Sequence, residues 1–577
     1  MLRRFSSTGW AFVLAFLANG LLLWHFHDHY WWPPDEGSYA HVAERILDGE
    51  VLNRDVQDIH AGAINFLNAG ALALFGRDML AMRYPLMAAA WLQALLSFWL
   101  FRRRGPWVAL VASLVGTAFG VVQFLDPTAH WYSLVLFWVI ALYLAEADLG
   151  RPWRLEFLGA LVGTQFCFRQ LSGVITAVGV VAYLLLRLPN GSGAEPPSRP
   201  PRLARGLAVI LMAGLGFYLW MATDANGLVL LGLWPLALLA LSFRRLRLPD
   251  RAVLALAGRL LAGAVIAALP LVAYHLFHGS LASWLRDITV VAASVPHLEF
   301  MKVLSYASDF VAGGFAVLLE PRSLLDVASG LYWLTVPMAF LAAGLWTAWR
   351  LRRSPAIPDV LPFLAPFYGL VSVHLQNATY LYFAVGVSLL ALLWLSREAR
   401  PAVRWAVALY LASASIIALE CQAGQSGRRS WDALLRGQTE PVVASESLLP
   451  RCRLKIEPYQ LKVYHRMVEL IQRETQPGEA IFALPSHSEL YFLAERRNPF
   501  RFYNLLLGAK DPEEQQSVLS QLVAEPPKLL IFDRSDKYVT AFSDEVHARM
   551  GSGYEQIARI DDFWIYRRRE PSQAPKN

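Results

Sequence analysis

The sequence predicts an all-α polytopic membrane domain of about 13 transmembrane helices, followed by an extracytoplasmic α/β domain. Hydrophobic residues make up 56% of the 577 residues. The mean hydropathy of +0.37 is higher than that of ordinary soluble domains. The apolar residues form repeated stretches of about 17 to 25, the length that crosses a bilayer. After Glu420 these stretches stop, and the composition becomes typical of a soluble domain.

The net charge of +7 comes from basic residues in alternate breaks between the apolar stretches. Arginines cluster at 102–104, 244–251 and 350–353, whereas the intervening breaks carry carboxylates and histidines. This alternation follows the positive-inside rule, so we expect a cytoplasmic N-terminus and a C-terminal domain outside. It also explains the positive charge without a nucleic-acid partner. The high Arg and Ala content indicates a bacterium, and hence a multi-pass protein of the inner (plasma) membrane with a periplasmic C-terminal domain.

The apolar stretches define the domains. The membrane domain covers residues 1–419, and a long outer loop, 27–80, follows its first span. A cytoplasmic linker rich in Gly, Ser and Pro, 190–205, divides this domain roughly in half. Arg3 and Arg4 precede the first span as in a signal peptide, but no cleavage site follows, so we expect this span to be retained. The expected spans are 8–26, 82–101, 106–125, 130–147, two within 152–188, 206–222, 228–242, 252–277, 328–349, 358–374, 378–396 and 401–419.

The C-terminal region, 420–577, has the pattern of a small periplasmic α/β domain. A helix-like stretch at 459–474 is followed by short apolar strand patterns at 480–484, 528–532 and 563–566. Cys421 and Cys452 lie in this region, where oxidising conditions allow a disulfide. Two unpaired thiols are the alternative, because two cysteines give no distance between them.

The outer loop opens with two adjacent carboxylates at the membrane boundary. The run Trp31-Trp32-Pro33-Pro34 precedes Asp35 and Glu36. Aromatic residues anchor at the headgroup level and the prolines end the span, so the carboxylates are expected just outside the hydrocarbon. There a carboxylate can take a proton from an acceptor hydroxyl, as a general base does. The alternative is that both residues merely cap a loop helix.

Several spaced elements of this loop carry a resemblance to a known family. They are Asp35-Glu36-Gly37 with Tyr39, Gly49-Glu50-Val51, Arg54-Asp55, Leu67-Asn68-Ala69, Leu74-Phe75-Gly76 and Arg83. Together they resemble the protein O-mannosyltransferase and lipid A aminoarabinose transferase family of GT-C glycosyltransferases. The resemblance implies a GT-C fold, a polyprenyl-phosphate-linked sugar donor, and a lipid, polysaccharide or protein acceptor outside the cytoplasm. It also implies a catalytic acid at Asp35, with Glu36 beside it.

The chain departs from the family pattern at one place. Many relatives have a Lys-Pro-Pro run after the Arg-Asp element, where this chain has His60-Ala61-Gly62. The lysine that would hold the lipid phosphate is therefore absent. His60 can donate to phosphate in its place.

Other residues are candidates for the donor phosphate and for acid chemistry. Arg169 and Gln170 lie at an outer turn between two spans, where a charge is costly unless it has a function or a partner. Phosphate binding and pairing with a carboxylate both remain open for Arg169, and Arg83 and Arg54 are further phosphate candidates. Asp126, in the second outer break, is a second candidate acid, and an N-cap at Asp126 or Thr128 is the alternative.

No metal site and no certain cofactor are predicted. His275 and His278 share a helix face, and with Glu36 or His60 they offer the one alternative, a divalent metal site. A transporter or flippase of a lipid-linked or small polar substrate is the competing function, because about a dozen spans and a central linker also suit secondary carriers. Carriers usually place ionisable groups at mid-membrane, whereas here the unusual residues cluster at the outer ends of the spans. The sequence therefore favours an integral membrane glycosyltransferase.

Overall fold

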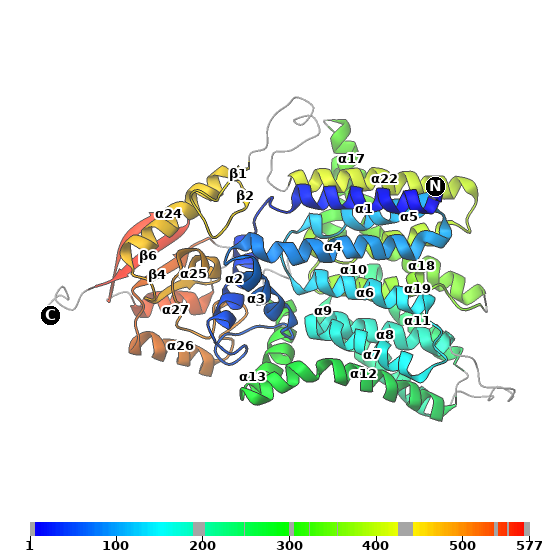
Figure 1. The fold of residues 1–577 in the computed structure, drawn as a ribbon, viewed down its shortest axis with the longest axis horizontal. Helices are drawn as coiled ribbons and strands as arrows, with labels where there is room; N and C mark the ends of the chain where they lie inside the picture. Colours follow the sequence, from blue (N-terminus) through cyan, green and yellow to red (C-terminus); the bar gives the residue numbers. More distant parts are fainter. Residues whose placement is uncertain are drawn as a thin grey trace, which may run out of the picture.

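The computed structural model describes residues 6–187, 202–246, 249–298, 305–321, 323–354, 356–424, 442–535, 540–550 and 553–569. Long helices lie side by side along the long axis of the molecule, and the C-terminal domain covers one end of this bundle (Figure 1). Two shorter helices, α2 (Pro33–Leu47) and α3 (Ala63–Phe75), lie between the bundle and that domain. The predicted membrane domain and C-terminal domain are therefore both present.

A helix or a bent pair of helices occupies each expected span. Within the described residues, nine helices are long and apolar enough to cross a membrane, or ten if the pair α17 and α18, bent by 42°, is one span. Three other helices at expected spans, α7, α19 and α21, are shorter or less apolar. The helices are α1 (Ser7–Phe26), α4 (Met79–Phe101), α5 (Pro106–Ala118), α6 (Ala129–Glu146), α7 (Pro152–Phe168), α8 (Gln170–Arg187), α9 (Arg202–Ala222), α11 (Leu233–Arg244), α12 (Asp250–Phe277), α17 (Leu324–Thr335), α18 (Met338–Arg353), α19 (Val360–Gly369), α21 (Val385–Ser396) and α22 (Pro401–Gly424).

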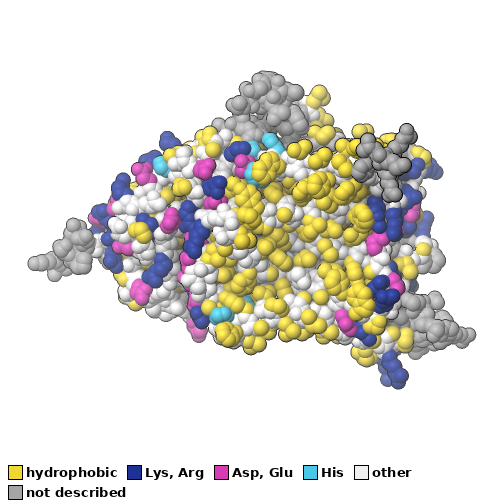
Figure 2. Space-filling model, in the orientation of Figure 1, with side chains coloured by type: hydrophobic (Ala, Val, Ile, Leu, Met, Phe, Trp, Pro, Cys, Tyr) yellow, Lys and Arg dark blue, Asp and Glu magenta, His cyan; other side chains and the backbone are white. Residues whose placement is uncertain are grey.

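The basic breaks meet at one end of the bundle, as their alternation predicts. Arg104 and Arg350, from two different breaks, both contact Asp359, and Arg245 donates to the Ser354 carbonyl at 2.8 Å. Figure 2 shows Lys and Arg side chains gathered at the end opposite the C-terminal domain, with a broad hydrophobic face between the two ends. This distribution is typical of a bundle that spans a bilayer.

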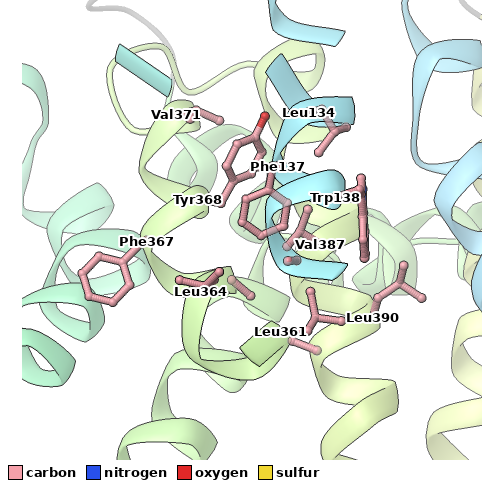
Figure 3. Packing of buried hydrophobic residues seen from close by; sticks show 14 of the residues in the cluster. Leu134, Phe137, Trp138, Leu361, Leu364, Phe367, Tyr368, Val371, Val387 and Leu390 are labelled. Carbon is pink, nitrogen blue, oxygen red and sulfur yellow. The ribbon is translucent and has the colours of Figure 1, made fainter. Parts of the chain in front are cut away.

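Large apolar side chains fill the centre of the bundle (Figure 3). Phe137 of α6 packs against Tyr368 of α19, with ring centroids 4.4 Å apart. Trp138 lies on the side facing α21, near Val387 and Leu390. These contacts hold α6, α19 and α21 together as the core of the membrane domain.

Helices α7 and α12 pack with their backbones almost in contact. A Cβ atom at Gly163 would lie 2.6 Å from the Ala264 carbonyl oxygen, and side chains at Gly159 and Gly263 would overlap the carbonyls of Leu260 and Glu156. Small residues allow this approach, which gains dispersion energy where lipid offers no hydrophobic driving force. The α7–α12 pair is therefore a closely fitted unit.

The C-terminal domain is a three-layer α/β/α sandwich. Its sheet has the order β3-β4-β6-β5, in which β3 and β4 are parallel and the other neighbours antiparallel. One face packs against α24 and α25, and the other against α26 and α27. The elements are β1 (Val443–Ala444), β2 (Lys455–Ile456), α24 (Pro458–Glu474), β3 (Ile481–Leu484), α25 (Ser488–Ala494), α26 (Pro512–Ala524), β4 (Leu529–Asp533), α27 (Ala541–Met550), β5 (Tyr554–Ile560) and β6 (Phe563–Arg568).

Three of the four sheet strands lie where the sequence predicts them. β5 was not expected, because Glu555, Gln556 and Arg559 interrupt its apolar pattern. Cys452 is a buried free thiol, and the side chain of Cys421 lies outside the described residues, as do most of the predicted linker and the segment 425–441.

Candidate active site

Helix α2 carries the paired carboxylates and packs against α4 and α25. Pro33 and Pro34 occupy its first positions, where a missing N–H costs nothing, and Asp35 and Glu36 lie in the first turn, where the helix dipole favours negative charge. The N-cap is Trp32, so neither carboxylate caps the helix. Glu36 faces α4, Gly37 faces α25, and the face of Asp35 also carries Tyr39.

Glu36 is sequestered in a buried ion pair. Arg83 of α4 donates to both of its oxygens, at 2.7 and 2.9 Å, and neither side chain has any exposed surface. The guanidinium also donates to the carbonyls of His29 and Tyr30, at 2.8 and 2.6 Å. Arg83 lies buried between α1, α2 and α4. Its N–H groups already donate to protein acceptors, so none remains for a substrate.

Asp35, in contrast, is exposed at the outer end of the bundle. One turn along the same face, the Tyr39 hydroxyl lies 2.8 Å from Thr128 Oγ1, in the segment before α6. Asp126, two residues before Thr128, is 2% exposed, and its Oδ1 has no hydrogen-bond partner among the described residues. Burial and the charges of Asp35 and Glu36 raise the pKa of Asp126 well above its usual range. These causes favour the protonated form of Asp126, beside an accessible carboxylate.

A row of aromatic and imidazole rings extends from α2 across the outer end of the bundle. His60 lies 6.0 Å from Tyr39 and 6.4 Å from His130, measured between ring centroids. Tyr380 packs edge-on against His130 at 5.2 Å and against His374 at 5.0 Å. The row brings together the first loop, the start of α6 and the segment that follows α19.

Arg169 lies between α7 and α8, and among the described residues its guanidinium has no carboxylate partner. It is 5% exposed, and within the described residues its side chain donates one hydrogen bond, from Nη1 to Ser172 Oγ at 3.0 Å. A buried guanidinium without a carboxylate is typical of an anion-binding site.

The other predicted phosphate ligands have local partners. Gln170 donates to the carbonyls of Ile59 and Ile288, at 2.7 and 3.2 Å. Arg54 is about half exposed and pairs with its neighbour Asp55 at 2.8 Å. His60 Nδ1 lies 2.9 Å from Asp58 Oδ1. The structure thus brings Asp35, Asp126, His60 and Arg169 to one region, and Gln170 lines its edge.

Sequence reasoning gave no role to Tyr39, His130, His374 or Tyr380. Tyr39 stands in the conspicuous loop motif, and its i, i+4 spacing from Asp35 is the signal that places both on one face. His130, His374 and Tyr380 come from segments far apart in the chain, and only tertiary packing brings them together. Buried polar atoms of His130 and His374 have no hydrogen-bond partner among the described residues, so they can still bind a polar ligand.

The histidines considered for a metal lie apart from this region. His275 Nδ1 is 2.8 Å from Ser280 Oγ, and its ring stacks on Trp284 at 4.8 Å. In the part of the chain that the structure describes, no group of three or more His, Cys, Asp and Glu side chains has the geometry to hold a metal ion.

Comparisons with known proteins give a distant structural likeness. No protein-family model matches the chain, and no curated protein matches it. The chain is similar to crystal structures of ArnT from Cupriavidus metallidurans, one bound to undecaprenyl phosphate and one in the apo state. The bound structure is 13% identical, with 97% of this chain and 98% of that chain covered and a TM-score of 0.39. The apo structure is 14% identical over the same shares, with a TM-score of 0.38.

Proposed function

We propose that this protein is an integral membrane glycosyltransferase that moves a sugar from a polyprenyl-phosphate donor to an acceptor outside the cytoplasm. The observation that carries the proposal is the arrangement at the outer end of the bundle. The accessible carboxylate of Asp35 shares a face of α2 with Tyr39, whose ring lies 6.0 Å from the ring of His60. Gln170, the neighbour of the buried Arg169, donates to the carbonyl of Ile59 beside His60, so Asp35 and Arg169 both approach this part of the first loop. A base for the acceptor and a cation for the leaving phosphate are the two charges that such a transfer needs.

Asp35 is the proposed base. The acceptor hydroxyl gives its proton to the Asp35 carboxylate as its oxygen bonds to the anomeric carbon of the sugar. Tyr39, on the same face of α2 and bonded to Thr128, restricts where the acceptor can lie. Asp35 has the exposure that an acceptor requires, whereas Glu36 is fully buried against Arg83.

Arg169 is the proposed phosphate ligand. As the bond from the anomeric carbon to the phosphate oxygen breaks, the leaving phosphate keeps the electron pair and gains negative charge. A buried guanidinium stabilises this charge strongly, because little water screens it. His60 is the second proposed ligand of the same phosphate, in the position where the resembling family has a lysine. Its Nδ1 donates to Asp58, so Nε2 donates to the phosphate only when the ring is doubly protonated.

Asp126, Glu36 and Arg83 have supporting roles in this proposal. In its protonated form, which the raised pKa favours, Asp126 offers the substrate a hydrogen-bond donor beside Asp35 and does not compete as a base. The Glu36–Arg83 pair fixes the first turn of α2 against α4. We assign Gln170 and Arg54 no contact with the donor, because their side chains bond to neighbouring groups.

The orientation follows from the basic end of the bundle. If that end is cytoplasmic, then Asp35, Arg169 and the C-terminal domain face the periplasm of a bacterial inner membrane. Polyprenyl chains are apolar and dissolve in the bilayer. The donor phosphate can therefore reach Arg169 at the outer membrane boundary while its polyprenyl chain stays in the bilayer.

Replacement of Asp35 by Asn tests the function. The purified protein, reconstituted in vesicles with an undecaprenyl-phosphate-sugar donor and cell-envelope lipid acceptors, should transfer the sugar, and Asp35→Asn should reduce kcat by about 10²- to 10⁴-fold. The matched control is Asp48→Asn at the other end of α2, where Asp48 pairs with Arg77 on the surface. Full activity in the Asp35 variant, at equal protein amount, would remove the assigned base.

A further inference from the structure

A buried histidine of the C-terminal domain is held between two carboxylates. His487 Nδ1 lies 2.8 Å from Glu489 Oε1, and His487 Nε2 lies 2.9 Å from Asp533 Oδ2. The three side chains are at most 7% exposed. Both ring nitrogens face carboxylate oxygens, which only the doubly protonated imidazolium can satisfy. Burial opposes this charge, yet the two carboxylates raise the pKa of His487 to about 9, so His487 is cationic at neutral pH.

This triad connects every layer on one side of the domain. Asp533 ends β4 and Glu489 lies in the first turn of α25. Tyr464 of α24 donates to the same Glu489 oxygen at 2.9 Å, and Phe563 of β6 packs edge-on against the imidazole at 4.8 Å. Glu489 of α25 and Asp533 of β4 are thus the titratable groups that contact His487, and Tyr464 of α24 helps His487 to fix the Glu489 carboxylate.

Glu489 lies directly against the helix that carries the proposed base. A Cβ atom on Gly37 would lie 2.6 Å from Glu489 Cα and would overlap the Glu489 side chain. The neighbouring residues are also joined, because Ser38 Oγ lies 2.9 Å from Ser488 Oγ. The first turn of α25 therefore packs closely against α2 only two residues after Asp35.

We propose that His487 is a positioning residue for Asp35. The imidazolium holds Glu489 and with it the first turn of α25, and α25 holds the outer end of α2 at the height where Asp35 meets the acceptor. The inference rests on the proposed function of Asp35. It also gives the C-terminal domain a role. In this role the domain holds α2, which carries Asp35, in place and contributes no group that touches the substrate.

Hydrogen exchange and kinetics of the full-length protein test this role. His487→Gln removes the cation that joins the two carboxylates, so amides of residues 33–47 should exchange at least about tenfold faster, and kcat should fall by about tenfold or more at an unchanged KM for the donor. The matched control, Arg567→Gln, removes pairs with Glu474 and Glu555 in the same domain. Unchanged exchange of 33–47 in His487→Gln, or an equal change in the control, overturns the inference.

A second variant covers the case in which His487→Gln does not fold. Asp533→Asn keeps the His487–Glu489 pair and removes one carboxylate, so it should give a smaller change in the same direction in exchange and in kcat. No change in this variant, with His487→Gln misfolded, would likewise overturn the inference.

A double-mutant cycle separates positioning from a general loss of stability. Gly37→Ala forces α2 away from Glu489, whereas Gly70→Ala on α3, which has open space for a Cβ, is its matched control. If His487 acts through the contact of α25 with α2, then Gly37→Ala together with His487→Gln should lower kcat by little more than the worse single change. Losses that multiply would overturn the proposed route.

The two proposals fail in different ways. Faster exchange of 33–47 in His487→Gln, in a protein that transfers no sugar from the undecaprenyl-phosphate donor, would remove the proposed function and keep the support of α2 by His487. A normal kcat and normal exchange in that variant, in a protein that does transfer sugar, would remove the positioning role alone.

Discussion

Arg83 and Glu36 form a two-pronged ion pair that has no contact with solvent, with Nε 2.7 Å from Oε1 and Nη2 2.9 Å from Oε2. Because of this pair, the two adjacent carboxylates of α2 have different environments. Glu36 points inward and joins α2 to α4, whereas Asp35 stays accessible. Two residues that look equivalent in the sequence therefore have different environments and should respond differently to substitution.

Loss of Arg83 should destabilise the protein. Arg83→Ala leaves the Glu36 carboxylate buried without a partner, and such a change costs about 3–5 kcal/mol. Thermal unfolding of the purified protein in detergent measures the effect. Arg103→Ala is the control, because Arg103 is 69% exposed in its pair with Glu146 and should contribute less than about 1 kcal/mol. Equal unfolding temperatures for the two variants would contradict the structural role of the buried pair.

Asp126 should tolerate replacement by its neutral analogue. Burial and the charges of Asp35 and Glu36 raise its pKa well above the usual range, so the protonated acid and an asparagine carry the same charge. We expect Asp126→Asn to retain transfer activity to within about tenfold, in contrast to the loss in Asp35→Asn. Parallel assays of both variants at pH 7 measure this contrast. A greater loss for Asp126→Asn than for Asp35→Asn would assign the base to Asp126.

Arg169 should matter for the donor more than for stability. Arg169→Gln keeps hydrogen-bond donors but removes the charge that stabilises the leaving phosphate, and charge-assisted hydrogen bonds are worth about 1.5–3 kcal/mol. The expected result is a fall in kcat/KM for the donor of about 10- to 200-fold. Arg54→Gln, at a half-exposed arginine paired with Asp55, should change the same ratio by less than about threefold. A similar loss in both variants would argue against a specific phosphate contact.

The stability of the C-terminal domain should depend on the charge of His487. Its pKa is raised from 6.5 to about 9, so its ion pairs stabilise the fold fully below about pH 6.5. This contribution declines between about pH 6.5 and 9 and is absent above that range. The shift corresponds to about 3 kcal/mol. Unfolding followed by tryptophan fluorescence from pH 6 to 10 measures it, and His487→Gln should lack this dependence. A wild-type profile as flat as that of the variant would contradict the charged triad.

Hydrophobic periodicity made the fold of the membrane domain predictable. Each apolar stretch must satisfy its own backbone hydrogen bonds in lipid, so length and composition alone place the helices. The bend between α17 and α18 was not predicted. The apolar stretch is continuous on both sides of Pro337, so its hydropathy alone indicated one straight span. In the C-terminal domain β5 was missed, because its exposed positions interrupt the strand pattern.

The candidate site was only partly predictable. The sequence placed Asp35 just beyond the first span, because the run of Trp and Pro residues marks the membrane boundary. The sequence alone does not show that Arg83 pairs with Glu36 and not with the donor phosphate, because Arg83 and Glu36 are 47 positions apart. Arg54 and Arg83 were equally plausible as phosphate ligands. The row of rings through His130 and Tyr380 forms only where the first loop, the start of α6 and the segment after α19 pack together. Residue spacing within any one of these segments does not predict such packing.

The interlocked glycines of α7 and α12 bear on how the chain is assembled during synthesis. The surface around Gly159 and Gly163 is shaped for the backbone of α12 and for nothing bulkier. Translation must continue from α7 through three further membrane helices, α8, α9 and α11, before α12 emerges, so this surface first meets lipid and exchanges it for α12 later. A single larger residue there would leave every helix able to insert, yet would stop the late helix from joining the finished bundle.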